Sequence, residues 1–391
     1  MVLTAKITTT ASYRSLSNIF LAINMYLNIE SSAPSFSTTK LWIKKIGYYQ
    51  LHSPKEKADD WIIIMDESIG IGQEKVLVIL GIRESKTDFT RPLKIQDMEP
   101  IIVKSKEKWT GEDIANELEI VKKNLGKVKY AVTDAGSTLK KGLKEAKITH
   151  VYDITHAIAI ALERIYKNDV IYKAFVHQAG LMRSKQCCGQ YSHLIPPNQR
   201  SKSRFLNMDI LSKWSIGVLS AIDKKTMTLA EEEELQWVKE QKSFIIEMNS
   251  LMTIIEKISI ILKNEGLSRQ TKAKCKALLK RCNSGRLKQF KEYMIAYLKE
   301  NGKQINRKTK ELICSSDIIE STFGKYKNEL SKNPMSGITD LVLMIPALTI
   351  KLTKEVVNTA IDSCSVKTIE AWNNENLCSS LLSKRKAVFC N

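Results

Sequence analysis

The stretch WIIIMDESIGIGQEKVLVILGI at residues 61–82 decides the fold class of this chain. Its first five residues, Trp61 to Met65, are apolar, and the carboxylic acid Asp66 follows them directly. Short apolar runs bounded by turn residues are typical of buried strands. A second run, at 75–82, comes after a turn with two glycines. The pattern predicts two paired strands, the first of which carries Asp66 at its end.

The same kind of pattern continues outward to residue 167. PIIVK (100–104), KYAVTD (129–134) and THVYDI (149–154) predict three further strands. Apolar residues at helical spacing predict three helices, over 110–125, 137–146 and 156–167. Three strands followed by strands alternating with helices predict an α/β core with a mixed five-stranded sheet. This is the RNase H-like order, in which strands 1 and 4 are neighbours.

Asp66 and Asp134 each come at the end of a predicted strand. In this order the two carboxylates would lie side by side at the carboxyl edge of the sheet. Their mutual repulsion is relieved by a divalent cation, and Mg²⁺ prefers such hard oxygen ligands. Two ions can activate an attacking oxygen and stabilise a leaving one in phosphoryl transfer. A turn or helix cap is the ordinary alternative for a strand-end Asp, and Asp134 before Ala-Gly-Ser fits that role as well.

The chain is strongly basic, and the excess is uneven. It has 391 residues with 61 Lys and Arg against 42 Asp and Glu, a net charge of +19. Residues 263–311 hold 15 Lys and Arg against four Asp and Glu, a net of +11. A solvated helical face is the alternative, but the chain-wide bias favours nucleic acid as a partner. No strand pattern persists from 170 to 311, where long helices are predicted at 238–262 and 271–298, so this region is predicted to be an all-helical basic insertion.

The N-terminal region predicts a DNA-binding helix-turn-helix. Residues 12–27 have helical spacing, and a second helix is predicted to begin after Ser37 and to stop at Gly47. This second helix carries the candidate DNA contacts Lys40, Lys44 and Lys45. Residues 1–10 are predicted to be unstructured.

The eight cysteines are scattered, which is typical of reduced thiols in a cytoplasmic protein. Cys187, Cys188 and His193 could begin a zinc site, but no second ligand pair follows at zinc spacing. No apolar run reaches the roughly 18 residues of a membrane span. We therefore expect a cytoplasmic, nucleoid-associated protein without a membrane partner.

Three pieces of the chain, in order, resemble bacterial insertion-sequence transposases of the DDE class. They are WIIIMDESIGIGQEKVLVILGI, KYAVTDAGSTLKKGLKEAKITHVYDITHAIA and SSDIIESTFGKYK. The N-terminal region is similar to the helix-turn-helix before such cores, and the resemblance covers about residues 12–167 and 314–360. It implies a catalytic and metal-binding triad of Asp66, Asp134 and Glu320 with two Mg²⁺ or Mn²⁺ ions. It also implies DNA partners, namely transposon terminal inverted repeats and target DNA, and a homodimer in the active complex.

Glu320 is supported mainly by this resemblance, because spacing alone fits an ordinary surface helix equally well. Lys327 lies two helical turns further along nearly the same face and matches a DNA-contacting Lys of one transposase branch. The Tyr and Arg that precede the Glu in that branch are Ile313 and Ser316 here, which leaves the branch open.

Asp153 and His156 follow the fifth predicted strand and could line the site. A buried, hydrogen-bonded cap of the next helix is the alternative. An RNase H-like nuclease, or an inactive DNA-binding relic or repressor, would share much of this pattern. The predicted domains are 1–51 helix-turn-helix, 52–60 linker, 61–169 core, 170–311 insertion, 312–360 second part of the core and 361–391 tail.

Overall fold

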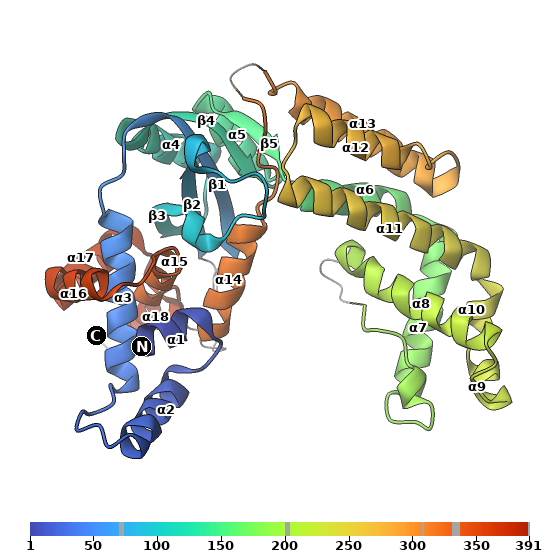
Figure 1. Cartoon of the computed structure of the whole chain (residues 1–391), viewed down its shortest axis with the longest axis horizontal. Coiled ribbons are helices and arrows are strands. Elements are labelled where there is room, and N and C mark those ends of the chain that lie inside the picture. Colours follow the sequence, from blue (N-terminus) through green and yellow to red (C-terminus); the bar gives the residue numbers. More distant parts are fainter. Residues whose placement is uncertain (70–73, 200–203, 307–308, 331–336, 390–391) are drawn as a thin grey trace. The chain divides into compact units, whose positions relative to one another are not determined.

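The computed structural model describes residues 1–69, 74–199, 204–306, 309–330 and 337–389. The turn expected between the first two strands lies outside these residues. The chain falls into two compact units, and Figure 1 shows their elements. The first unit comprises residues 1–88, 92–151 and 316–391, and the second comprises 89–91 and 152–315. The second unit therefore interrupts the first in sequence, with boundaries wider than the predicted 170–311.

One mixed five-stranded sheet, in the order β3-β2-β1-β4-β5, forms the centre of the first unit. β1 pairs antiparallel with β2 and parallel with β4, which confirms the predicted adjacency of strands 1 and 4. The first three residues of β1 fall within the predicted linker. The strands are β1 (Ala58–Ile69), β2 (Lys75–Arg83), β3 (Glu99–Lys106), β4 (Gly126–Thr133) and β5 (Thr149–Tyr152).

The two faces of the sheet are covered by different helices. α4 (Gly111–Leu125) and α5 (Ser137–Glu145) pack on the face of Trp61, Ile63 and Met65. α14 (Asp317–Glu329) contacts β1, but its buried residues do not belong to that cluster. α14 therefore packs against the opposite face. This arrangement brings a late segment of the chain against the first strand.

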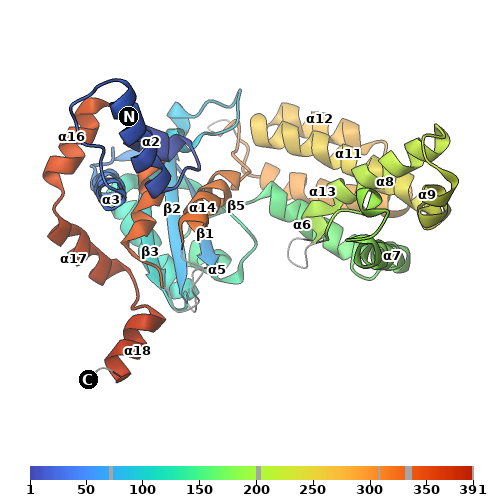
Figure 2. The same cartoon turned by 90° about the horizontal axis from the view of Figure 1, so that it is seen from below.

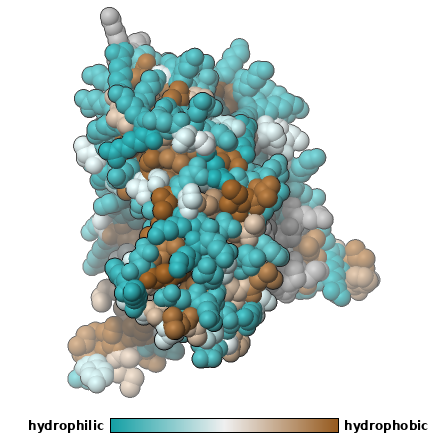
Figure 3. Space-filling model, turned by 90° about the vertical axis from the view of Figure 1, so that its right-hand side faces the viewer, coloured by the Kyte–Doolittle hydropathy of each residue, from teal (hydrophilic) through white to brown (hydrophobic). Residues whose placement is uncertain are grey.

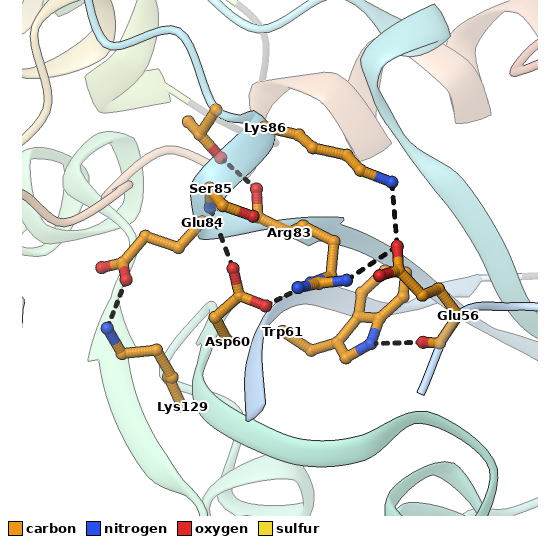
Figure 4. Close-up of polar contacts among 9 residues, drawn as sticks. Glu56, Asp60, Trp61, Arg83, Glu84, Ser85, Lys86 and Lys129 are labelled. Atoms are coloured by element: carbon orange, nitrogen blue, oxygen red, sulfur yellow. Dashed lines mark hydrogen bonds and ion pairs between the residues drawn. The ribbon is translucent and has the colours of Figure 1, made fainter. Parts of the chain in front are cut away.

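An ion-pair network holds the beginning of β1 (Figure 4). Arg83, at the end of β2, pairs with Asp60 and, at 2.9 Å, with Glu56. Lys129 on β4 pairs with Glu84, which follows β2 directly. Because these groups come from three neighbouring strands and their ends, the network fixes β1, β2 and β4 relative to one another.

The prediction that residues 1–10 are unstructured is wrong, because α1 (Val2–Thr8) is a helix. Its Lys6 is almost fully buried, pairs with Glu329 at 2.5 Å and donates to the carbonyl of Ala11 at 2.8 Å. This pair joins α1 to the end of α14. Contacts so distant in sequence leave no local signal in residues 1–10.

The next two helices are α2 (Tyr13–Tyr26) and α3 (Phe36–His52). The prediction that Gly47 stops the second helix is wrong, since α3 continues through it. A Cβ at Gly47 would overlap the carbonyl group of Leu343, so glycine serves close helix packing here. Nine residues, 27–35, connect the two helices, whereas a helix-turn-helix has a turn of about three or four.

Helices occupy most of the segment 361–391, which was predicted to be a C-terminal tail. α16 (Lys354–Ser363), α17 (Val366–Asn376) and α18 (Leu381–Phe389) follow one another along one side of the first unit (Figure 2). Before them, η5 (Asp340–Leu343) and α15 (Met344–Ala347) pack on α3, which also contacts α16 and α17. α3 is therefore enclosed by the C-terminal helices.

The second unit contains helices and no named strand among its described residues. The helix predicted at 271–298 is in fact two, α12 (Arg269–Leu279) and α13 (Gly285–Gly302), because the chain turns before Gly285, which has a φ of 53°. None of the described helices of the chain is long and apolar enough to cross a membrane. The remaining elements are α6 (Ile154–Tyr166), α7 (Val170–Gln186), η3 (Ser192–Leu194), η4 (Arg204–Asn207), α8 (Met208–Asp223), α9 (Leu229–Glu234), α10 (Gln236–Glu240) and α11 (Lys242–Asn264).

Candidate active site

The parallel register of β1 and β4 brings Asp66 and Asp134 to the same level. Ile62 pairs with Tyr130 and Ile64 with Val132. Asp66 lies two residues after Ile64 and is still within β1. Asp134 lies two residues after Val132 and is the first residue after β4. Because side chains alternate along a strand, Asp66 is on the face of Ile62 and Ile64, which α14 contacts. The register of β1 and β4 therefore places Asp66 and Asp134 next to each other along the sheet edge, as the order of the strands predicted.

Asp134 begins the turn that leads from β4 into α5. Its Oδ1 accepts a hydrogen bond from the backbone N–H of Gly136 at 2.8 Å, and the side chain is half-buried. A Cβ at Gly136 would lie 2.9 Å from that oxygen, so the glycine allows the carboxylate to approach the backbone. Asp134 therefore stabilises the turn, which was the alternative to a metal ligand. The hydrogen bond from Gly136 also fixes the direction of the carboxylate.

Glu67, next to Asp66, is a third carboxylate at this edge that the sequence analysis missed. Its Oε2 is 3.4 Å from Lys75, while its Oε1 is buried and has no hydrogen-bond partner among the described residues. Burial raises the pKa of Glu67; Lys75 opposes this, and the negative charge of Asp134 adds to it. The sequence signal that could have indicated Glu67 is its position directly after Asp66, at the end of the apolar run.

His150 on β5 brings an imidazole near the same edge. Its Nε2 is 3.0 Å from Oγ1 of Thr133, the residue before Asp134. Burial lowers the pKa of His150, although Asp134 and the hydrogen bond to Thr133 act in the other direction. The imidazole is therefore biased toward its neutral form and brings little positive charge to the carboxylates.

Glu320 lies near the start of α14, and its side chain is exposed. The buried side of α14 includes Ile319, Phe323 and Tyr326. Lys327 is exposed on α14, with its ammonium 5.9 Å from the ring of Phe323. The structure therefore puts Glu320 on a helix that contacts β1, within the same unit as Asp66 and Asp134.

Among the described residues, no three His, Cys, Asp or Glu side chains are arranged to hold a metal ion. This applies to Asp66, Asp134 and Glu320, which are all described. It applies equally to the zinc alternative, where His193 instead contacts Glu231 at 3.0 Å. Two members of the predicted triad are at one level on neighbouring strands, and the third is on the helix that contacts β1.

Asp153 and His156 form a helix cap in the second unit. Asp153 is fully buried, and its Oδ1 accepts the backbone N–H of His156 at 2.8 Å and contacts Nδ1 of the same residue at 3.0 Å. This is an ordinary N-cap arrangement at the start of α6. These contacts account for both residues through local structure.

Two of the three lysines predicted to contact DNA are engaged inside the first unit. Lys44 pairs with Asp340 at 2.7 Å, and Lys45 donates to the carbonyl of Ile361 at 2.6 Å. Lys40 is half-buried, and no side chain of α3 from Lys40 to Leu51 is fully exposed. A helix enclosed in this way has little free surface for the major groove.

The basic stretch of the second unit forms α12 and α13, which pack on each other. Some of its cations are paired within the unit, such as Lys274 with Glu265 at 2.5 Å and Lys303 with Glu300 at 2.6 Å. Side chains that reach solvent are Lys276, Lys280, Arg281, Lys288 and Lys299. These two helices therefore present a basic surface of the kind that phosphate backbones attract.

Comparison with known proteins does not establish a family. No family model matches the chain, and no curated protein matches it. The fold is similar to a solved Drosophila P element transposase strand transfer complex, with a TM-score of 0.46 and 13% sequence identity. That alignment covers 91% of this chain and 92% of the other. A function has to be argued from the residues themselves.

Proposed function

We propose that this chain is a DNA transposase of the DDE class with an RNase H-like core. It would cut one strand at each transposon end and join the freed 3′-OH to target DNA. The observation that carries the proposal is the common level of Asp66 and Asp134 on neighbouring parallel strands. The sequence resemblance supplies Glu320 as the third member, on a helix that contacts the same strand.

The residues at this edge fit a divalent metal site in their chemistry. Asp66 and Asp134 offer hard oxygen ligands, and burial together with the negative charge of Asp134 raises the pKa of the neighbouring Glu67, so further negative charge is unfavourable at this edge. We propose that Asp66, Asp134 and Glu320 hold two Mg²⁺ or Mn²⁺ ions. Such ions, when bound, activate the attacking oxygen and stabilise the leaving oxygen of a phosphodiester.

The protein's own part in this reaction is to hold carboxylates and DNA in place. The N–H of Gly136 orients Asp134, and strand pairing orients Asp66. We assign DNA backbone contacts to the basic surface of α12 and α13 and to exposed Lys327. For the N-terminal region, DNA binding stays a prediction that depends on Lys40, since Lys44 and Lys45 have partners within the unit.

The test is a cleavage and strand-transfer assay with the full chain, its candidate terminal repeats, a target plasmid and Mg²⁺ or Mn²⁺. We expect Asp66→Asn, Asp134→Asn and Glu320→Gln each to reduce both steps by about 1,000-fold or more, since each removes a ligand charge. Asp59→Asn, the same change at an exposed position on the same strand, is the matched control. Mn²⁺ binding measured by electron paramagnetic resonance should weaken in the first two variants and not in the control.

Two results would contradict the proposal. If the protein binds DNA but never nicks or joins it, and Asp66→Asn changes nothing, the chain is a DNA-binding protein without this activity. If branched DNA is cut without any preference for terminal repeats, it is a structure-specific nuclease using the same carboxylates.

A further inference from the structure

α2 exposes more apolar surface than a helix on the outside of a protein ordinarily does. Leu16 is its only buried residue, while Met25 is 72% exposed and Tyr26 90% exposed. Other large apolar side chains that reach solvent in and after α2 are Ile19, Leu21, Leu27, Ile29 and Phe36. In the space-filling view the lower left end, at the height of α2 in Figure 1, is largely brown (Figure 3). A helix that is apolar around most of its circumference is ordinarily covered by protein.

The shape of this segment is set by its own hydrogen bonds. Ser12 caps the beginning of α2 by accepting the N–H of Ser15. At the other end Asn28 has a φ of 48°, and the N–H of Ile29 reaches back to the carbonyl of Asn24 at 2.9 Å. This is a Schellman motif, a regular helix ending. The apolar residues therefore sit on a well-formed surface element, with both of its ends capped.

The segment is also almost without charge, in a chain that carries +19. From Ser15 to Thr39 the one charged residue is Glu30, although charged residues make up 26% of the whole sequence. A DNA-binding helix needs cations for phosphates, and a helix that lies on a membrane surface is rich in Lys or Arg on its polar face. α2 has neither. Two copies of a basic chain repel each other least where the surface is neutral.

The two charged residues nearest to the uncharged part of α2 in the sequence lie at opposite ends of the helix. Arg14 is in the first turn, and Glu30 comes shortly after the last. If two copies of α2 pack antiparallel across a two-fold axis, Arg14 of each copy faces Glu30 of the other, and the helix dipoles oppose each other favourably. Parallel packing would bring like charges together.

We propose that α2 is a self-association surface, and that two copies of this chain pair through antiparallel α2 helices about a two-fold axis. The surface lies wholly on the N-terminal helices of the first unit. The inference does not depend on the proposed catalysis, because its test uses neither DNA nor metal. A failure of the self-association proposal can therefore be distinguished from a failure of the proposed catalytic function.

The test measures the mass of the full chain by sedimentation equilibrium over micromolar concentrations. We expect a monomer–dimer equilibrium, and Met25→Lys or Tyr26→Lys should weaken the dimer by about 10- to 100-fold, because each places a charge where an apolar side chain is buried and close to Arg14 of the other copy. Both positions are exposed in the single chain, so the fold tolerates the change. Val170→Lys, at a 78% exposed position on α7, is the matched control and should leave the dimer unchanged.

A charge exchange tests the antiparallel arrangement. Arg14→Glu and Glu30→Arg should each weaken the dimer, and the double variant should restore it. The proposal is overturned if the wild-type chain stays monomeric at 50 to 100 times the concentration needed for function, or if neither α2 variant weakens the dimer. It is also overturned if α2 instead mediates binding of the monomer to phosphatidylcholine–phosphatidylglycerol vesicles.

Discussion

Carboxylates lie near both ends of β1, but their electrostatic surroundings differ between the two ends. At the beginning, Glu56, Asp60 and Glu84 are matched by Arg83, Lys86 and Lys129 (Figure 4). At the far end, Asp66 and Asp134 are at one level and Glu67 follows Asp66; burial raises the pKa of Glu67, and the negative charge of Asp134 adds to this. Balanced charges hold strands in place, whereas accumulated like charge destabilises a fold and is typical of a site that binds a cation. Close ion pairs therefore mark the structural end of β1, and the raised pKa of Glu67 marks the candidate catalytic end.

Removing the cation from each end should have the largest and most unequal effect on stability. Arg83 is 12% exposed, and Arg83→Met would leave Asp60 and Glu56 without their main partner. We expect a clear fall in the free energy of unfolding, because Asp60 keeps its charge and loses its partner. Lys75→Met at the far end should cost about 0.5 kcal/mol or less, since Lys75 is 47% exposed and lies 3.4 Å from Glu67. Urea denaturation of both variants measures this difference. Equal losses of stability would contradict the distinction between the two ends of β1.

Neutralising one carboxylate at each end of β1 should change the free energy of unfolding in opposite directions. Glu67→Gln removes repulsion with Asp134 and a buried charged oxygen, so it should stabilise the protein by up to about 1 kcal/mol. Asp60→Asn at the beginning of β1 should destabilise it, because Arg83 loses its charged partner. Thermal denaturation of the two variants checks the signs. A clear loss of stability in Glu67→Gln would show that Glu67 is a structural residue like Asp60.

The pH dependence of stability should be the smallest difference. Burial tends to raise the pKa of Asp60, but hydrogen bonds from Ser85 and Arg83 outweigh it, so the pKa is lowered. A carboxyl group with a lowered folded-state pKa contributes stability above its unfolded pKa of about 4 and loses it as the pH falls through the folded value. Unfolding measured from pH 6 to pH 3 should show this loss in the wild type and a smaller loss in Arg83→Met. Parallel curves for the two proteins would contradict the assignment.

What the sequence predicted well is what local pattern determines. The apolar runs before Asp66 and Asp134, and their order with the intervening helices, were sufficient to predict neighbouring strands with both carboxylates at one level. Gly47 was misread because its partner, Leu343, is nearly three hundred residues away. For the same reason nothing in residues 1–10 indicated α1, whose Lys6 depends on Glu329.

The candidate site was predictable only in part. Asp66 and Asp134 followed from pattern and metal chemistry, whereas Glu320 depended on resemblance and remains a proposal. Glu67 was missed because alternation along a strand directs it away from the face of Asp66, so it did not fit a simple triad. The Asn283-Ser284-Gly285 turn between α12 and α13 did carry a local signal, which helical periodicity on both sides concealed.

The interruption of the first unit by residues 152–315 has a consequence for synthesis on the ribosome. The ends of the second unit are tied together, since the N–H of Ile154 donates to the carbonyl of Cys314 at 2.8 Å, so it can fold as a closed loop. All five strands emerge before it, but α14 emerges after it. At about 5–20 residues per second, one face of β1 would wait roughly 10 to 30 s for its covering helix. Nascent chains stalled within the second unit should therefore expose the apolar surface of Ile62 and Ile64 to chaperones, and chains long enough to release α14 should not.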